Sequence, residues 1–179
     1  PWRHEDSWYE ERKRALTLAA LPNRRLGSVL ELGPATGLLT LDLARRAERV
    51  TCVDASEQAL RRTRSRIEEA GLSDGVQLHH ARVPEAWPEG SFDTVVVSEV
   101  AYFLTRSEWA ATLRRIVATL SEEGTLVLVH WTHPLQDCPL DTATAHAMAV
   151  RETGLDPVVE HVEPDFTLLV LRPRGLPSL

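Results

Sequence analysis

A short segment in the first quarter of the chain combines a carboxylate with glycines in a pattern that suits ligand binding. Glu31 ends an apolar run, Gly33 follows it, and Gly37 comes after a further three residues. Glycine lets the backbone adopt angles closed to other residues and lets a ligand approach the main chain. The Glu31 carboxylate would repel a phosphate and attract an ammonium group. The segment therefore indicates a nucleoside ligand with a positively charged end rather than a pyrophosphate.

A second carboxylate lies 23 residues after Glu31, where Asp54 closes another apolar run. An acidic residue about 20 residues beyond a glycine turn can bind both ribose hydroxyls with its two oxygens. A dinucleotide motif would need two more glycines, at positions that hold Ala35 and Leu38. A phosphate-binding P-loop needs a lysine after its glycines, and the chain has one lysine, Lys13. The spacing thus favours a nucleoside pocket over both phosphate-binding motifs.

Two further groups that could exchange a proton lie at the ends of apolar runs. Glu99 follows the run 92–98, where a carboxylate could act as a general base or could simply begin a helix on the surface. His130 lies near the end of the run 126–131, and its imidazole could take a proton near neutral pH. His130 and His133 also have the spacing of half a metal site. The sequence completes it with no carboxylate or cysteine cluster, so we expect no bound metal.

These residues must be positioned by an alternation of strands and helices. Apolar periodicity and turn signals predict strands over 28–32, 49–54, 76–83, 92–98, 126–131, 158–162 and 166–171. They predict helices over 7–20, 38–47, 57–70 and 142–153, and one that starts at a capping box of Thr105 and Glu108 and ends at Gly124. The alternation is typical of an α/β protein with a doubly wound sheet, in which ligands bind at the carboxyl ends of the strands.

The composition is that of an ordinary globular domain. The 179 residues are 43% hydrophobic and 26% charged, enough for one domain with a sizeable core. The formal net charge of −6 disfavours nucleic acid as a partner, and no apolar stretch approaches the length of a membrane span. Cys52 and Cys138 make no disulfide framework. No signal peptide is visible, so we expect a cytoplasmic location. The chain starts at Pro1 rather than Met, so we expect further residues upstream. We also expect a monomer or homodimer.

Residues 31–37 resemble the first motif of the class I S-adenosylmethionine-dependent methyltransferases, E/D-x-G-x-G-x-G, with Ala35 in place of the middle glycine. More narrowly, the chain is similar to the NodS-type nodulation N-methyltransferases. The segments that carry the narrower resemblance are 1–3, 7–13, 17–22, 98–104 and 128–134. Together they extend over much of the chain.

The resemblance implies a single methyltransferase domain over 1–179, with a helical lid segment over 1–22 and a Rossmann-like core over 28–171 of seven strands, the last antiparallel. It implies S-adenosyl-L-methionine as cofactor, with Asp54 at the ribose and Glu31 beneath the methionine moiety. The residues that it implies in cofactor binding are Tyr9, Arg12, Glu31, Gly33, Pro34, Ala35, Gly37, Asp54, Ala55, Arg82, Val83 and Ser98. Those that it implies around the methyl acceptor are Tyr102, Trp131 and His133.

Such enzymes transfer the sulfonium methyl group in one in-line step, so catalysis is mostly the orientation of two reactants. The NodS-type resemblance implies a small-molecule acceptor, an amine on a sugar or a related metabolite, whose proton Glu99 or His130 would remove or hold. Two alternatives remain open: an O-methyltransferase of a small hydroxylated natural product with His130 as base, and a non-catalytic cofactor-binding subunit. A nicotinamide-dependent dehydrogenase is a further rival.

Overall fold

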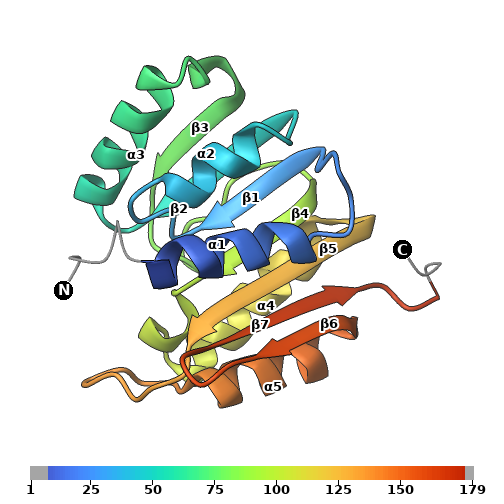
Figure 1. Ribbon diagram of the computed structural model, residues 1–179. Helices are drawn as coiled ribbons and strands as arrows, with labels where there is room; N and C mark the ends of the chain where they lie inside the picture. Colours follow the sequence, from blue (N-terminus) through green and yellow to red (C-terminus); the bar gives the residue numbers. More distant parts are fainter. Residues whose placement is uncertain (1–7, 176–179) are drawn as a thin grey trace.

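The computed structural model describes residues 8–175, in which seven strands form one sheet with helices on both faces (Figure 1). The strands are β1 (Ser28–Leu32), β2 (Arg49–Asp54), β3 (Val76–His80), β4 (Phe92–Ser98), β5 (Leu120–Trp131), β6 (Asp156–Val162) and β7 (Phe166–Arg172). The α-helices are α1 (Trp8–Ala20), α2 (Leu38–Ala44), α3 (Glu57–Glu69), α4 (Arg106–Thr119) and α5 (Thr142–Thr153), with short 3-10 turns η1 (Ser73–Gly75) and η2 (Ala101–Phe103).

The strand order is β3-β2-β1-β4-β5-β7-β6. The sheet extends from β1 to β3 in one direction and from β4 to β6 in the other, and β7 lies between β5 and β6. Strands β1 to β5 pair in parallel, and β7 runs antiparallel to both β5 and β6. The predicted doubly wound, seven-stranded sheet with an antiparallel last strand is therefore confirmed. In such a sheet a crevice forms outside the carboxyl ends of the strands where the order reverses, here between β1 and β4.

Neighbouring residues of a strand point to opposite faces of the sheet. Apolar residues therefore lie on both faces, and helices cover both. On β1, Leu30 and Leu32 pack in the core that Trp109 of α4 and Met148 of α5 share. Val29 points to the other face, where α1 and α2 pack. Figure 1 shows the same two layers, with α1 and α2 on the near side of the sheet and α4 and α5 on the far side.

Local signals in the sequence set the starts of two helices. Thr105 and Glu108 form the predicted capping box of α4: the Thr105 hydroxyl accepts from the Glu108 N–H at 3.3 Å, and the Glu108 carboxylate accepts from the Thr105 N–H at 2.7 Å. At α3, the Ser56 hydroxyl accepts from the Ala59 N–H at 3.2 Å. These side chains satisfy amides that have no partner within the helix.

The predicted end of α4 is wrong. The sequence predicts a helix that runs to Gly124, but α4 ends at Thr119 and β5 begins at the next residue. Leu120 pairs with Phe92 of β4, which draws the chain into the sheet four residues before the glycine. A strand pairing between residues distant in sequence thus overrides the local helix signal.

Strand β3 also ends earlier than predicted, at His80 rather than at residue 83. The Ala81 N–H still donates to the Asp54 carbonyl at 3.1 Å, but the Ala86 N–H then donates to the Arg82 carbonyl at 3.0 Å and the chain turns. The turn carries Arg82 and the following Val83 to the crevice at the sheet edge.

Residues 1–7 of the predicted lid segment lie outside the described residues, and the part of it that is described begins with α1 at Trp8. This helix lies across the near face of the sheet, beside β1 and β4 (Figure 1). Between residues 8 and 175, no helix is both long and apolar enough to cross a membrane.

Candidate active site

A cavity of about 1000 Å³ opens at the carboxyl ends of β1, β2 and β4, bounded on one side by α1. It is the crevice that the sheet order predicts. Thirteen of the predicted site residues line it: Tyr9, Glu31, Gly33, Pro34, Ala35, Asp54, Ala55, Arg82, Val83, Ser98, Glu99, Tyr102 and Trp131. Four do not: Arg12, Gly37, His130 and His133.

The turn after β1 brings backbone to the cavity wall. Gly33 has φ +77°, and a Cβ built on it would lie 2.3 Å from Cγ2 of Val100. The position therefore requires glycine both for its backbone angle and for the neighbour it touches. Ala35 also has a positive φ, of 50°, where the family motif carries its middle glycine.

Gly37 serves a different purpose from Gly33. It begins α2 with φ +79°, and a Cβ on it would lie 2.7 Å from the Cα of Thr63 in α3. The glycine lets α2 and α3 approach closely. Since Gly37 does not line the cavity, we assign it to helix packing rather than to ligand contact.

Glu31 is a buried carboxylate at the floor of the cavity. Its Oε2 accepts from the Thr40 hydroxyl at 2.6 Å and lies 3.5 Å from the Cys52 thiol. Burial raises the pKa of this carboxyl to about 7, although the hydrogen bond from Thr40 opposes the shift. A cationic ligand nearby would favour the ionised form of Glu31.

Asp54 ends β2, and its Oδ1 accepts from the Ser56 N–H at 2.7 Å, which orients the carboxylate at the cavity wall. Ala55 follows it on the same wall. Beyond β3, Val83 is buried in the core and gives the cavity an apolar side. The Arg82 side chain is largely exposed and pairs with Glu108 at 3.4 Å, so its charge is directed to α4.

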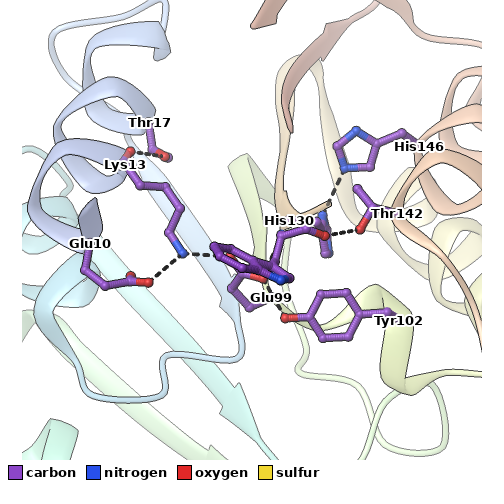
Figure 2. A network of polar contacts seen from close by, with 9 residues as sticks. Glu10, Lys13, Thr17, Glu99, Tyr102, His130, Thr142 and His146 are labelled. Carbon is purple, nitrogen blue, oxygen red and sulfur yellow. Dashed lines mark hydrogen bonds and ion pairs between the residues drawn. The ribbon is translucent and has the colours of Figure 1, made fainter. Parts of the chain in front are cut away.

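Glu99 lies at the centre of a polar network at the mouth of β4 (Figure 2). Its Oε2 accepts from the Tyr102 hydroxyl at 2.5 Å and from the Trp131 N–H at 3.0 Å, while its Oε1 lies 2.7 Å from Nζ of Lys13. Glu99 has φ 58°, an uncommon value for a residue with a side chain. Contacts of its side chain with three segments of the chain thus accompany a backbone conformation that a residue other than glycine seldom adopts.

Lys13 also lines the cavity, although the sequence did not predict it as a site residue. It projects from α1 into the cavity lining, is 7% exposed, and lies 3.1 Å from Oε1 of Glu10 as well as against Glu99. Charged side chains are seldom this buried unless they are paired. The signal that could have found it is its type, because Lys13 is the single lysine among 20 basic residues.

Tyr9 packs its ring edge-on to Trp131, with centroids 5.3 Å apart, and Lys13 lies 5.2 Å from the centre of the Tyr9 ring. Its hydroxyl is buried and has no hydrogen-bond partner within residues 8–175. Burial, with the charge of Glu99 nearby, raises the pKa of this phenol. A buried, neutral donor without a partner is suited to a ligand that enters the cavity.

His130 faces the protein interior and not the cavity. It is fully buried, and its Nε2 accepts from the Ala101 N–H at 3.1 Å, so in the neutral ring the proton lies on Nδ1. That nitrogen lies 3.0 Å from Nε2 of His146 in α5 (Figure 2). Burial lowers the pKa of each ring to about 3. Both nitrogens of His130 are therefore occupied by protein groups, which leaves neither directed at an acceptor.

The other two predicted residues outside the cavity join structural elements to one another. Arg12 makes a two-pronged ion pair with Glu163 in the β6–β7 turn, at 2.5 Å for each contact. His133 Nε2 lies 2.7 Å from Oδ1 of Asp165. Neither side chain lines the cavity itself, although the His133 ring packs against Trp131, which does, with centroids 4.8 Å apart. The arrangement favours anchoring roles for both. Among residues 8–175, no group of histidine, cysteine, aspartate or glutamate side chains has the arrangement of a metal site.

The family model described as Nodulation protein S (NodS) matches residues 1–134. Nodulation protein S of Bradyrhizobium diazoefficiens is 35% identical over 131 residues, which make up 71% of this chain and 60% of that protein. The corresponding protein of Sinorhizobium fredii is 31% identical over 132 residues, or 71% of this chain and 58% of that protein. The chain thus spans less than two thirds of the length of these curated relatives.

Solved structures extend the likeness over nearly the whole chain. A candidate methyltransferase from Pseudomonas syringae superposes with a TM-score of 0.81 at 36% identity, covering 92% of this chain and 99% of that one. N-methyltransferase NodS from Bradyrhizobium japonicum WM9, in complex with S-adenosyl-L-homocysteine, superposes with a TM-score of 0.80 at 22% identity, covering 98% and 92%. The predicted class I methyltransferase fold is confirmed.

Proposed function

The chain belongs to the NodS family, and from that premise we propose that it is an S-adenosyl-L-methionine-dependent methyltransferase acting on a small molecule. The family resemblance drawn from the sequence is thereby confirmed. The observation that carries the proposed activity is that one cavity joins the glycine turn, Asp54 and Glu99. A volume of about 1000 Å³ is large enough for a nucleoside cofactor and a small acceptor together.

The cavity residues fit this cofactor. Gly33 offers bare backbone, the oriented carboxylate of Asp54 suits two ribose hydroxyls, and Val83 gives an apolar surface for a base. The unpartnered Tyr9 hydroxyl can donate to a carboxylate, and Glu31 lies where an ammonium group would favour its ionised form. When bound, the cofactor supplies a methyl group on a sulfonium sulfur, which departs as a neutral thioether.

Carboxylates and aromatic rings near α1 support an amine as acceptor. Glu10, Glu99 and Asp165 contribute carboxylates to the lining, and the rings of Tyr9 and Trp131 pack beside them. Such a setting attracts a cationic nitrogen. Only a neutral amine can attack, so the bound ammonium form first passes a proton to Glu99 and on to water. The neutral nitrogen then forms a bond to the methyl carbon as the carbon–sulfur bond breaks.

Binding of S-adenosyl-L-homocysteine, measured by calorimetry, tests the cofactor site. Asp54→Ala should weaken it by about 1.5–3 kcal/mol, the usual loss for hydrogen bonds to a charged group. Asp74→Ala, in the exposed turn η1, is the matched control and should bind like the parent chain. Equal affinity in both variants, or tight binding of NAD instead, would contradict the site assignment.

Methyl transfer itself is tested with radiolabelled S-adenosyl-L-methionine against small amines and phenols of similar size. We expect label in amines, including amino sugars, and none in phenols. Label in phenols alone would favour the O-methyltransferase alternative, and cofactor binding without transfer to any acceptor would favour a non-catalytic subunit.

A further inference from the structure

The ammonium group of Lys13 occupies a site that would recognise any primary alkylammonium. Its Nζ lies 2.7 Å from a carboxylate oxygen of Glu99, 3.1 Å from one of Glu10, and 5.2 Å from the centre of the Tyr9 ring. Two carboxylates and an aromatic face are the usual surroundings of a bound organic cation. Figure 2 shows Lys13 reaching from α1 toward Glu99 across the space between the helix and the sheet.

Glu99 does not depend on Lys13 for its position. Its second oxygen accepts from the Tyr102 hydroxyl and from the Trp131 N–H, at 2.5 Å and 3.0 Å. These two donors come from η2 and from the end of β5, so they would hold the carboxylate in place if the lysine withdrew. The oxygen that faces Lys13 is thus available to another cation.

Helix α1 does not depend on Lys13 either. The neighbouring Arg12 pairs with Glu163 through both of its terminal nitrogens, and Arg14 pairs with Asp42 of α2 at 3.0 Å. Lys13 also has an alternative partner on its own helix, since Glu10 lies one turn before it. The lysine can therefore leave Glu99 without losing its ionic contact and without releasing the helix.

We propose that Lys13 is a stand-in for the acceptor: a primary alkylammonium exchanges with its Nζ at Glu99, and Lys13 then pairs with Glu10 alone. The exchange leaves the Glu99 carboxylate paired with a cation. A neutral hydroxyl compound in the same place would leave that carboxylate without one. Lys13 is thereby a specificity-determining residue that admits amines and opposes phenols and alcohols. The proposal takes its acceptor chemistry from the proposed function, whereas the cation site stands on these contacts alone.

Lys13→Ala tests the site, because truncation removes the equivalent of one n-propylammonium ion. Calorimetry with n-propylammonium chloride should show binding to the variant at least about 10-fold tighter than to the parent chain, as expected for a desolvated charge-assisted contact. The double variant Lys13→Ala/Glu99→Gln should lose this gain, and 1-propanol should bind no variant measurably. Equal affinity in parent and Lys13→Ala chains, or equal binding of 1-propanol, would overturn the proposal.

The unaltered chain gives a second measurement that requires no variant to fold. Because the chain has one lysine, labelling with lysine carrying ¹³C at the ε position yields one side-chain NMR signal. Titration with n-propylammonium should shift that signal with saturation, and 1-propanol at the same concentration should not. An unmoved signal at saturating n-propylammonium would refute the exchange. Neither measurement uses cofactor or methyl transfer, so failure of the exchange and failure of the proposed function are distinguishable.

Discussion

The two ends of the cavity are built in different ways. The cofactor end uses neighbours in sequence: Glu31, Gly33 and Ala35 lie within five residues, and Asp54 ends the strand paired with β1. At the acceptor end, Lys13 and Glu99 are 86 residues apart. The cofactor end is formed largely by residues of one local motif, whereas the acceptor end is formed by residues that only folding brings together. Variants at the two ends should therefore fail in different ways.

The largest effect is expected at the cofactor end, from Gly33→Val. The added side chain meets Val100, whose Cγ2 lies 2.3 Å from the position of a Cβ, and valine is strained at φ +77°. We expect calorimetry to detect no binding of S-adenosyl-L-homocysteine to the folded variant.

Gly75→Ala is the matched control. It adds a side chain to a glycine in η1, where the nearest atom from a distant part of the chain, the Glu48 carbonyl oxygen, lies 3.9 Å from the new Cβ. It should bind like the parent chain. Circular dichroism must show that the Gly33 variant is folded. If the folded variant still binds S-adenosyl-L-homocysteine, the assignment of this turn to cofactor binding is wrong.

At the acceptor end, Glu99→Gln should lower turnover by about 10²-fold, as loss of a general base typically does, with cofactor affinity changed by no more than about three-fold. Steady-state methylation of an amine acceptor measures both. The loss should shrink as pH rises toward the pKa of the acceptor amine, because the nucleophile then needs no help to shed its proton.

Glu160→Gln makes the same chemical change on the exposed edge strand β6 and should keep full activity. If Glu99→Gln is also fully active at every pH, catalysis by this chain is positioning alone. Together with Gly33→Val, the pair separates the two ends: one variant loses binding, and the other loses turnover.

The same contrast explains what the sequence could predict. The alternation of strands and helices and the glycine turn follow from periodicity and short motifs, which depend on near neighbours. The seven strands with an antiparallel last strand follow only from the family resemblance. Asp54 ends a buried run and Glu99 follows one, and parallel strands present such ends at one edge, so the sequence predicts both residues at the site. The position of Lys13 could not be predicted, since its burial depends on how α1 crosses the sheet.

His130 shows the opposite difficulty. It lies one residue before the end of a buried strand, and Glu99 follows one, so the pattern predicts that both reach the crevice. The side chain points instead to the face covered by α5, where His146 meets it. Which face a strand residue takes near a strand end depends on pleat and register, and a shift of one residue reverses it.

The protein also contains buried groups with opposite pH dependence: Glu31 at the floor of the cavity, and the pair His130 and His146 in the interior. His130 and His146 have folded-state pKa values near 3, below the usual 6.5, so the unfolded chain binds more protons and stability falls as pH drops below about 6.5. Glu31 has a folded pKa of about 7, above its usual 4.5, so its contribution is present at low pH and is lost as pH rises from about 4.5 to 7.

We therefore expect His146→Gln to reduce the loss of unfolding free energy between pH 7 and pH 5, and Glu31→Gln to increase it, each by about 2 kcal/mol. Urea denaturation at the two pH values measures the difference, which is insensitive to any constant destabilisation that a variant brings. The coupled histidine rings titrate as a pair, so His130→Gln should act in the same direction as His146→Gln. Identical differences in the parent and both variants would show that neither group titrates as its burial requires.

The smallest effect belongs to Ala35→Gly, which restores the middle glycine of the family motif. Ala35 has φ 50°, and alanine in this left-handed region carries strain of roughly 1 kcal/mol, which glycine removes. Glycine also gives the unfolded chain more freedom, at a cost of about 0.5–1 kcal/mol. The two terms nearly cancel, so stability should change by less than about 0.5 kcal/mol and cofactor affinity by less than about three-fold. Ala70→Gly, at a residue with φ −86°, has no strain to relieve and should lose the entropic amount alone. If both variants are destabilised equally in urea denaturation, the turn at Ala35 is unstrained, and the departure from the family motif has no energetic consequence there.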